Sequence, residues 1–373
     1  MDEAHVVVVG AGLLGGQVLD MLARLPNLRL TLVGRDEDVV PKRANLARLT
    51  AMHLGLDPKV NFAITDVTNI DRTAELIAVL SPDLLFTALS AQPYWMVRQL
   101  TDYQSSPGVN AGMAPWLPHQ LAPLVSLMSA CRSASETLPV VNAAFPDVTH
   151  AVLQSGGLAP YLGAGSVSNS VPALRLAASH LLEVPVHDVQ VQFVAEAYVT
   201  RCIPRLGHSG GAPFHLTVLN NDADVTDSLD IGELLRLVNT RFSRPSDSLS
   251  VALTAAASVR IISAILNDEG AVVHAPGPSS LMGGYPVRVW SDHVEVIYPD
   301  GLTPDRAQQI NMRSAKFNGI EELRQDGTVI LTEPSSTVLS QLLGFPISEF
   351  HYSEAAAISA AMSARMRDSK TSA

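Results

Sequence analysis

The pattern that most restricts the fold of this chain lies within its first 16 residues. Residues 6–16 read VVVVGAGLLGG, in which four valines are followed by Gly10, Gly12 and Gly15. A run of β-branched residues predicts a buried strand, and the spaced glycines permit a tight turn into a helix that packs closely on that strand. The free N–H groups and positive dipole end of such a helix attract phosphate. The pattern therefore predicts a strand–turn–helix unit that holds a diphosphate.

Residues 1–155 continue this alternation of short apolar runs and helical patterns. We expect strands at residues 5–9, 28–33, 60–64, 84–89 and 140–143, with helices at residues 13–25, 39–52, 71–80 and 117–132. Strands that alternate with helices indicate a parallel sheet with helices on both faces. The predicted class is therefore α/β, with a doubly wound Rossmann domain over residues 1–155.

The pattern changes near residue 156, where longer alternating segments predict an α+β domain with mostly antiparallel strands over residues 156–368. We expect a strand at 189–199, a loop rich in glycine and proline at 201–213, and later hairpins, one of them turned at residues 326–327. Residues 369–373 are polar and predict a disordered tail. The helices at 251–266 and 355–366 are rich in alanine and serine. They pack either between subunits of a homo-oligomer, a dimer or tetramer, or within one subunit.

The composition argues against several classes of protein. A net charge of −11 would repel a nucleic acid. Cys131 and Cys202 lie far apart and outside any CxxC pattern, so we expect neither a metal site nor a disulfide framework. No apolar run reaches the roughly 18 residues of a membrane span, and the short N-terminal run follows acidic residues, unlike a signal peptide. We therefore expect a cytoplasmic protein with no membrane partner and a small molecule as its substrate.

The glycine turn predicts a binding site for a nicotinamide dinucleotide, with the diphosphate held by the backbone of Gly10, Ala11, Gly12, Leu13, Leu14 and Gly15. The second strand ends in Gly34, Arg35 and Asp36, where an NAD site commonly has an acid at the strand end. The Arg35 guanidinium can pair with a 2′-phosphate, which favours NADP. NAD stays possible, with Arg35 in solvent and Asp36 on the ribose.

Two further loops follow strands at the edge of the sheet where such a ligand lies. Asp66 and Val67 come after the third strand and are expected to flank the adenine. Ser90, Ala91 and Gln92 come after the fourth strand, where we expect the nicotinamide ribose. Tyr94 and Trp95, just beyond, can form a lid or pocket wall, or serve as core or interface residues.

Three segments carry a resemblance to a known family: the glycine motif, residues 33–36 (VGRD) and residues 140–153 (VVNAAFPDVTHAVL). Through them, the chain resembles the lactate/malate dehydrogenase superfamily over residues 5–155. The segment VGRD is also similar to reductases of the saccharopine dehydrogenase type. In the superfamily an asparagine at the end of the fifth strand touches substrate and nicotinamide, and the resemblance assigns that place to Asn142.

The second half departs from the family pattern. The helix that should carry an Asp and an Arg three residues apart offers Arg175 without an acid. The long strand that should lead to a Gly-His-Gly loop ends in residues 195–198 (AEAY), without a histidine. The nearest histidine is His208, so the family's substrate class does not follow from the resemblance.

Four residues of the second half are candidates for the chemistry, beside Asn142. His208 is the first choice as proton donor, because the pKa of histidine lies near neutral pH; the alternative is a surface histidine without a role. Glu196 and Tyr198 share one face of the expected strand, where either can donate or orient a proton, although packing is a plainer role for Tyr198. Arg201 can hold a substrate carboxylate or balance surface charge.

The sequence thus predicts an NAD(P)-dependent dehydrogenase or reductase. It would transfer a hydride between nicotinamide and a small carbonyl, imine or hydroxy substrate. Two alternatives stay open. One is a lyase or hydrolase that oxidises its substrate transiently with a retained dinucleotide, and the other is a dinucleotide sensor without catalysis.

Overall fold

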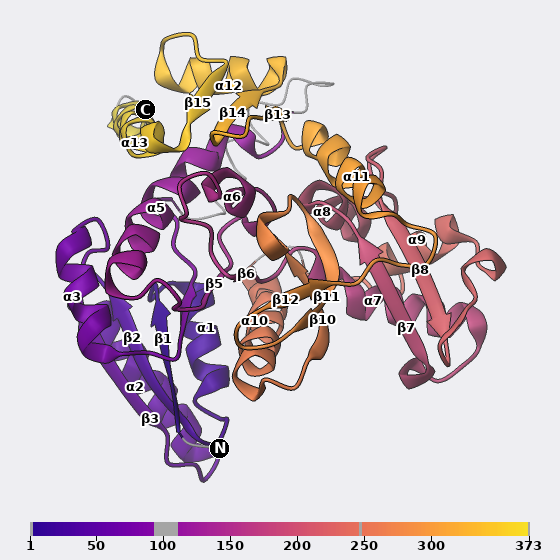
Figure 1. The fold of residues 1–373 in the computed structure, drawn as a ribbon, viewed down its shortest axis with the longest axis horizontal. Coiled ribbons are helices and arrows are strands. Elements are labelled where there is room, and N and C mark those ends of the chain that lie inside the picture. Colours follow the sequence, from indigo (N-terminus) through magenta and orange to yellow (C-terminus); the bar gives the residue numbers. More distant parts are fainter. Residues whose placement is uncertain (1–2, 93–110, 246–247, 372–373) are drawn as a thin grey trace.

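The computed structural model describes residues 3–92, 111–245 and 248–371 (Figure 1). Its N-terminal unit is a six-stranded parallel sheet with the strand order β3-β2-β1-β4-β5-β6. The strands are β1 (Ala4–Val9), β2 (Leu28–Gly34), β3 (Lys59–Ile64), β4 (Leu84–Thr87), β5 (Val140–Asn142) and β6 (Leu162–Gly163). The five predicted strands are confirmed. The two-residue strand β6 was missed because it is too short to show a pattern and lies in a glycine-rich stretch.

The four valines of β1 explain why the sheet is buried on both faces. Val6 and Val8 lie in one hydrophobic core, and Val7 and Val9 lie in another. The first core includes residues of α1 (Leu13–Leu22), α2 (Val39–His53) and α10 (Val251–Asn267), and the second includes residues of α3 (Ile70–Leu80), α5 (Leu117–Ala134) and α6 (Pro146–Leu153). Side chains of a strand alternate between its faces, so a continuous apolar run suits a strand covered twice.

The second half contains three antiparallel sheets of three strands each, and the predicted antiparallel character of its strands is confirmed. The first consists of β7 (Val189–Val194), β8 (His215–Asn220) and β9 (Ala223–Asp224); the second of β10 (Ala271–Pro276), β11 (Gly284–Val289) and β12 (Val294–Val296); the third of β13 (Ile320–Leu323), β14 (Thr328–Leu331) and β15 (Glu349–His351). The helices are α7 (Val167–Leu182), α8 (Ala197–Leu206), α9 (Ile231–Asn239), α10, α11 (Pro304–Phe317), α12 (Glu333–Leu343) and α13 (Ala355–Thr371).

The predicted strand at 189–199 and loop at 201–213 are confirmed only at residues 189–194 and 207–213, and are wrong in between, where a helix lies. Strand β7 ends at Val194, and α8 begins at Ala197. Glu196 is the N-cap of this helix, and its side chain accepts a hydrogen bond of 2.6 Å from the amide of Tyr198. A carboxylate cap satisfies an N–H that the helix leaves unpaired, which favours helix after this residue. Arg201 is consequently a helical residue.

The C-terminal elements pack on the first unit. Residues of β13–β15, α12 and α13 share the second hydrophobic core with α5 and β1, and in Figure 1 these yellow elements lie over α5. Helix α13 continues to Thr371, so residues 369–371 of the expected disordered tail are helical. The domain division at residue 155 stays a prediction.

Helix α10 departs from the expectation that no apolar segment is long enough to span a membrane. Residues 248–267 are long and apolar enough, by length and composition, to cross a membrane. A core helix can have the same composition, and Ala255, Ile261 and Ile265 of α10 lie in one hydrophobic core with Val18 and Leu19 of α1. The apolar face of α10 thus covers the sheet domain within this chain.

Candidate active site

The turn between β1 and α1 has the geometry that the glycine motif predicts. Gly10 has a φ of +111°, which side-chain-bearing residues rarely adopt. A Cβ on Gly15 would lie 1.8 Å from the carbonyl oxygen of Gly10, so only glycine allows the helix to approach the strand this closely. At Gly12, by contrast, a Cβ would meet no atom within 4 Å. The turn therefore fits a bulky ligand beside Gly12.

The start of α1 is suited to an anion. Gly12 is the N-cap of the helix, so no side chain satisfies its first N–H groups, and its first turn contains no acidic residue. Unpaired amides and the positive dipole end then face the open side of the turn. These features fit the diphosphate of a dinucleotide.

Arg43 is a residue of this turn that the motif does not include. Its side chain, from α2, places Nη2 3.4 Å from the carbonyl oxygen of Gly12. A Cβ on Gly16 would lie 2.6 Å from Arg43 Cζ, so the second glycine of the Gly15-Gly16 pair leaves room for the guanidinium. The two segments are 31 residues apart, and the sequence pattern gives no sign that they meet.

The residues after β2 and β3 lie together, as expected. Arg35 Nη1 is 3.9 Å from Asp66 Oδ2, and both side chains are largely exposed. The backbone amide of Thr68 and, to a lesser degree, its hydroxyl and Arg35 lower the pKa of Asp66. Val67 is buried. Asp36 Oδ1 accepts hydrogen bonds from the amides of residues 38 and 39, so this oxygen stabilises the start of α2.

Residues 88–92, which follow β4, form hydrogen bonds with α5 and α13. Ser90 Oγ donates to the carbonyl oxygen of Gln92, and the amide of Ala91 donates to the carbonyl oxygen of His119. Gln92 Nε2 donates to Ser363 Oγ at 3.3 Å. Tyr94 and Trp95 lie outside the described residues.

Asn142 ends β5 at the expected place, but its side chain is fully buried. Its Oδ1 accepts a hydrogen bond from the amide of Ala144, and its Nδ2 donates to Ala144 O and Thr149 Oγ1. In this structure the Asn142 amide shapes the loop after β5. Its predicted contact with substrate and nicotinamide stays a prediction.

A buried polar cluster lies where the two halves of the chain meet, and Asn318 is at its centre. Asn318 follows α11 and is fully buried. Its Nδ2 donates to Glu196 Oε1 at 2.7 Å, and its Oδ1 accepts from Arg201 Nη2 at 2.6 Å. The same oxygen accepts from the amide of Met113, shortly before α5. The cluster thus joins two predicted candidates, Glu196 and Arg201, through an asparagine that was not predicted.

Asp147 completes this cluster from the first turn of α6. It is fully buried, and its Oδ1 accepts a hydrogen bond of 2.9 Å from Ser166 Oγ. Among the described residues, Asp147 Oδ2 has no hydrogen-bond partner although it is buried. Burial, with the negative charge of Glu196 second, raises the pKa of Asp147 well above that of an ordinary carboxyl. Burial also raises the pKa of Glu196, against the effect of its hydrogen bonds and of Arg201.

Neither Asp147 nor Asn318 was identified from the sequence. The segment Pro146-Asp147 reads as a turn into a helix, and Asn318 belongs to no motif that the sequence shows. The one available signal was Asp147 itself, the only acid in a mostly apolar helical segment (PDVTHAVL). Acids are rarely buried without a partner, so such a residue is worth testing as a site residue.

The remaining candidates lie apart from the cluster or have other contacts. His208 is exposed, and its Nδ1 accepts a hydrogen bond from the amide of Gly210 at 3.0 Å. The ring of Tyr198 packs on Phe317, with ring centroids 5.5 Å apart, and lies beside Arg201. Arg175 donates to the carbonyl oxygens of residues 186 and 189, so it fastens α7 to the start of β7.

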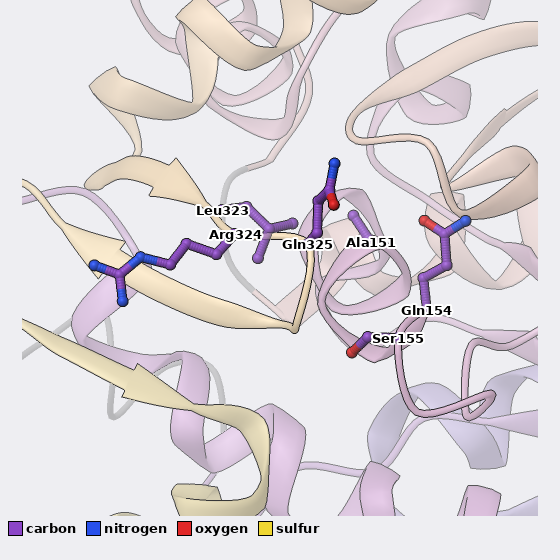
Figure 2. Close-up of a pocket in the computed structure, with 6 residues that line it drawn as sticks. All are labelled: Ala151, Gln154, Ser155, Leu323, Arg324 and Gln325. Atoms are coloured by element: carbon purple, nitrogen blue, oxygen red, sulfur yellow. The ribbon is translucent and has the colours of Figure 1, made fainter.

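A separate hollow is lined by α6, the residues after it, and the β13–β14 turn. Figure 2 shows its lining residues, Ala151, Gln154, Ser155, Leu323, Arg324 and Gln325. It contains none of the residues of the glycine turn or of the polar cluster. Within the part of the chain that the structure describes, no group of three His, Cys, Asp or Glu side chains is placed to hold a metal ion.

Comparison with known proteins gives structural neighbours only. No family model and no curated protein matches the sequence. The structure is similar to lactate dehydrogenase from Cryptosporidium parvum with lactic acid and NAD, at 17% identity and a TM-score of 0.59, covering 85% of this chain and 99% of that one.

Two further neighbours agree with this result. Lactate dehydrogenase from Eimeria maxima, with NADH and oxamate, is 13% identical with a TM-score of 0.59, and covers 85% of this chain and 92% of its own. Malate dehydrogenase from Picrophilus torridus is 17% identical with a TM-score of 0.57, and covers 84% of this chain and 96% of its own. The predicted resemblance is thus confirmed for the fold, and it extends beyond residue 155: the chain has the fold of lactate and malate dehydrogenases.

Proposed function

We propose that this protein is an NAD(P)-dependent oxidoreductase that acts on a small hydroxy or carbonyl compound. The observation that carries the proposal is the open glycine turn at Gly12 before an uncapped helix, on a fold whose solved neighbours hold NAD or NADH. The polar cluster lies beyond the carboxyl ends of β4, β5 and β6, the half of such a sheet that takes the second mononucleotide. The coenzyme, when bound, accepts or donates the hydride.

The cluster offers groups for binding a polar substrate. Arg201 uses Nη2 to hold Asn318, and among the described residues its buried Nε has no partner. A guanidinium with a free N–H can bind a carboxylate or polarise a carbonyl oxygen. We therefore assign Arg201 to the substrate, and this assignment favours a 2-oxo or 2-hydroxy acid over an uncharged ketone.

The activity can be tested by following nicotinamide absorbance. The purified protein is mixed with NADH or NADPH and a panel of small 2-oxo acids, ketones and imines. We expect turnover with at least one 2-oxo acid. Coenzyme binding without hydride transfer to any compound, or from any alcohol in the reverse direction, would favour the sensor function instead.

The residues around the adenosine end favour NADP as the coenzyme. The loop after β2 presents Arg35, and α2 adds Arg43 at the glycine turn. Asp36, the acid nearest the end of β2, caps α2 with Oδ1. Two guanidiniums and an engaged acid suit a 2′-phosphate better than a free ribose. The solved neighbours hold NAD or NADH, so coenzyme choice is a direct test of these two arginines.

We predict that Arg35→Ala and Arg43→Ala each weaken NADPH binding about tenfold, since each removes a charge-assisted contact worth about 1.5 kcal/mol, and leave NADH binding nearly unchanged. Fluorescence titration with both coenzymes measures the effect. Arg29→Ala, at the amino end of β2, is the matched control and should change neither affinity. Tighter binding of NADH than of NADPH by the wild-type protein would contradict the NADP preference.

A further inference from the structure

We infer that Asp147 and Ser166 form a proton relay at this site, in which the buried Asp147 carboxyl supplies a proton through the Ser166 hydroxyl. The inference rests on the proposed oxidoreductase function and names the groups that handle its proton. His208, the histidine expected for this task, lies outside the cluster and is exposed. The cluster contains the only buried carboxyls among the described residues, which makes them the candidates for this task.

Three helices begin at the polar cluster. Asp147 lies in the first turn of α6, Ser166 is the N-cap of α7, and Glu196 is the N-cap of α8. Ser166 has a φ of +49° and a ψ of −112°, a backbone conformation that a serine adopts only at an energetic cost. Phe145, just before α6, also has a positive φ. Strained residues of this kind gather at functional sites, where surrounding contacts hold them.

The charges in the cluster do not balance unless one proton is bound. Among the described residues, the charged or titratable groups facing the two carboxyls are Arg201, Tyr285 and Cys202. Burial raises the pKa of both Tyr285 and Cys202, so both stay neutral. Within the described part of the chain, one guanidinium then faces two buried carboxyls that interact electrostatically, and two such buried like charges do not both ionise at neutral pH.

The hydrogen bonds show which carboxyl holds the proton. Glu196 accepts from the amide of Tyr198 and from Asn318 Nδ2, and Asn318 also binds Arg201. Asp147 accepts one hydrogen bond, from Ser166, and its Oδ2 is unpaired. Hydrogen bonds to a carboxylate stabilise its charge, so Glu196 is the ionised partner and Asp147 the protonated one. Burial and the charge of Glu196 raise the pKa of Asp147 to about 8, in agreement with this assignment.

Ser166 connects the buried acid to the place where substrate binds. Its side chain is only partly buried, whereas Asp147 is fully buried, and its Oγ lies 2.9 Å from Asp147 Oδ1. Thr200 Oγ1, from α8, lies 3.5 Å from the same hydroxyl. Ser166 follows β6, and Asp147 follows β5, so both lie beyond the carboxyl ends of the parallel strands.

The proton step balances as follows in the direction of reduction. A bound reduced coenzyme would supply the hydride to the carbonyl carbon. The carbonyl oxygen takes the proton of the Ser166 hydroxyl, which points to the substrate in this step, so the 2.9 Å hydrogen bond is donated by protonated Asp147 Oδ1 to Ser166 Oγ. The O–H bond of Asp147 breaks at the same time, and its proton restores the hydroxyl. Asp147 is left as a carboxylate and regains a proton from solvent after the product leaves. Oxidation of an alcohol follows the same path in reverse.

Asp147→Asn and Ser166→Ala test the relay. Asparagine keeps the shape of the side chain and an acceptor for Ser166, but it has no proton to give. With a 2-oxo acid that the wild type reduces, we expect each variant to lower kcat by about 10²- to 10⁴-fold, with KM and coenzyme affinity nearly unchanged. The double variant should be no slower than either single one, because the two residues act as a unit. Ser168→Ala, two residues along in the same helix turn, is the matched control and should keep wild-type kcat.

Infrared spectroscopy gives a readout that needs neither coenzyme nor substrate. At neutral pH the wild type should show the carbonyl stretch of a protonated carboxyl group, and Asp147→Asn should lack it. A coenzyme-binding protein without this band, or a stable Asp147→Asn variant with wild-type kcat, would overturn the relay alone. A protein that shows the band but binds no nicotinamide coenzyme would overturn the proposed function, and the relay with it.

Discussion

Gly12→Ala is expected to weaken coenzyme binding at least about tenfold while the protein keeps its fold. A Cβ at residue 12 meets no protein atom within 4 Å, and the φ of −70° suits alanine, so the substitution causes no clash in the free protein. Alanine is a poorer N-cap than glycine, so the free energy of unfolding should fall by less than about 1 kcal/mol. The added methyl group lies where a diphosphate must approach the backbone. Titration with NADPH and NADH, together with thermal unfolding, measures both effects.

Gly15→Ala is the counterpart of Gly12→Ala, because it should mainly lower the stability of the fold. Its Cβ would lie 1.8 Å from the Gly10 carbonyl oxygen, so helix α1 must move away from β1. We expect a loss of about 3 kcal/mol or more in the free energy of unfolding. Equal coenzyme affinity in Gly12→Ala and wild type would remove the glycine turn as the binding site, and with it the main support for the proposed function.

The pH dependence of stability is expected to change when a buried histidine is replaced. Burial lowers the pKa of His150 from 6.5 to about 4, and the ring is fully buried against Gly277. The unfolded chain therefore binds a proton at His150 that the folded chain does not, and stability falls as the pH drops from the unfolded value toward the folded one. Between about pH 8 and about pH 5 this effect amounts to about 2 kcal/mol.

His150→Asn removes that proton and keeps a donor for the carbonyl oxygen of Gly277. Its stability at a single pH changes for packing reasons, but the difference from wild type should shrink by about 2 kcal/mol between about pH 8 and about pH 5. His119, which is also fully buried with a pKa lowered to about 4, should behave in the same way. Denaturant unfolding at several pH values measures the slope, and His187→Asn, at an exposed position, is the control.

Asp147→Asn should change the pH dependence of stability in the direction opposite to His150→Asn. The pKa of Asp147 is raised in the folded protein. The folded chain therefore holds a proton that the unfolded chain releases, and wild-type stability falls as the pH rises from the unfolded pKa toward the folded one. The variant should lose this dependence. An unchanged slope for His150→Asn, or a slope for Asp147→Asn that changes in the same direction as that of His150→Asn, would contradict these assignments.

The parts of the site that the sequence predicted are those formed by neighbouring residues. The glycine turn, the strand before it and the helix after it are specified within residues 4–22, where each glycine has a local geometric reason. The proximity of Arg35 and Asp66 was also predictable, because the ends of adjacent parallel strands meet at one edge of a sheet. The error at residues 195–201 came from reading alternation as strand, when the acid at residue 196 begins a helix.

The sequence by itself determined the α/β sheet and its phosphate-binding turn, because periodic burial and backbone freedom are properties of short segments. Only the tertiary structure brought together Met113, Asp147, Glu196, Arg201 and Asn318, which the chain separates by up to 205 residues. Whether a side chain of this kind is exposed, paired or protonated depends on what packs around it. Burial between the two halves of the chain gives Asp147 its altered pKa and Arg201 its fixed position, and no local pattern records that burial.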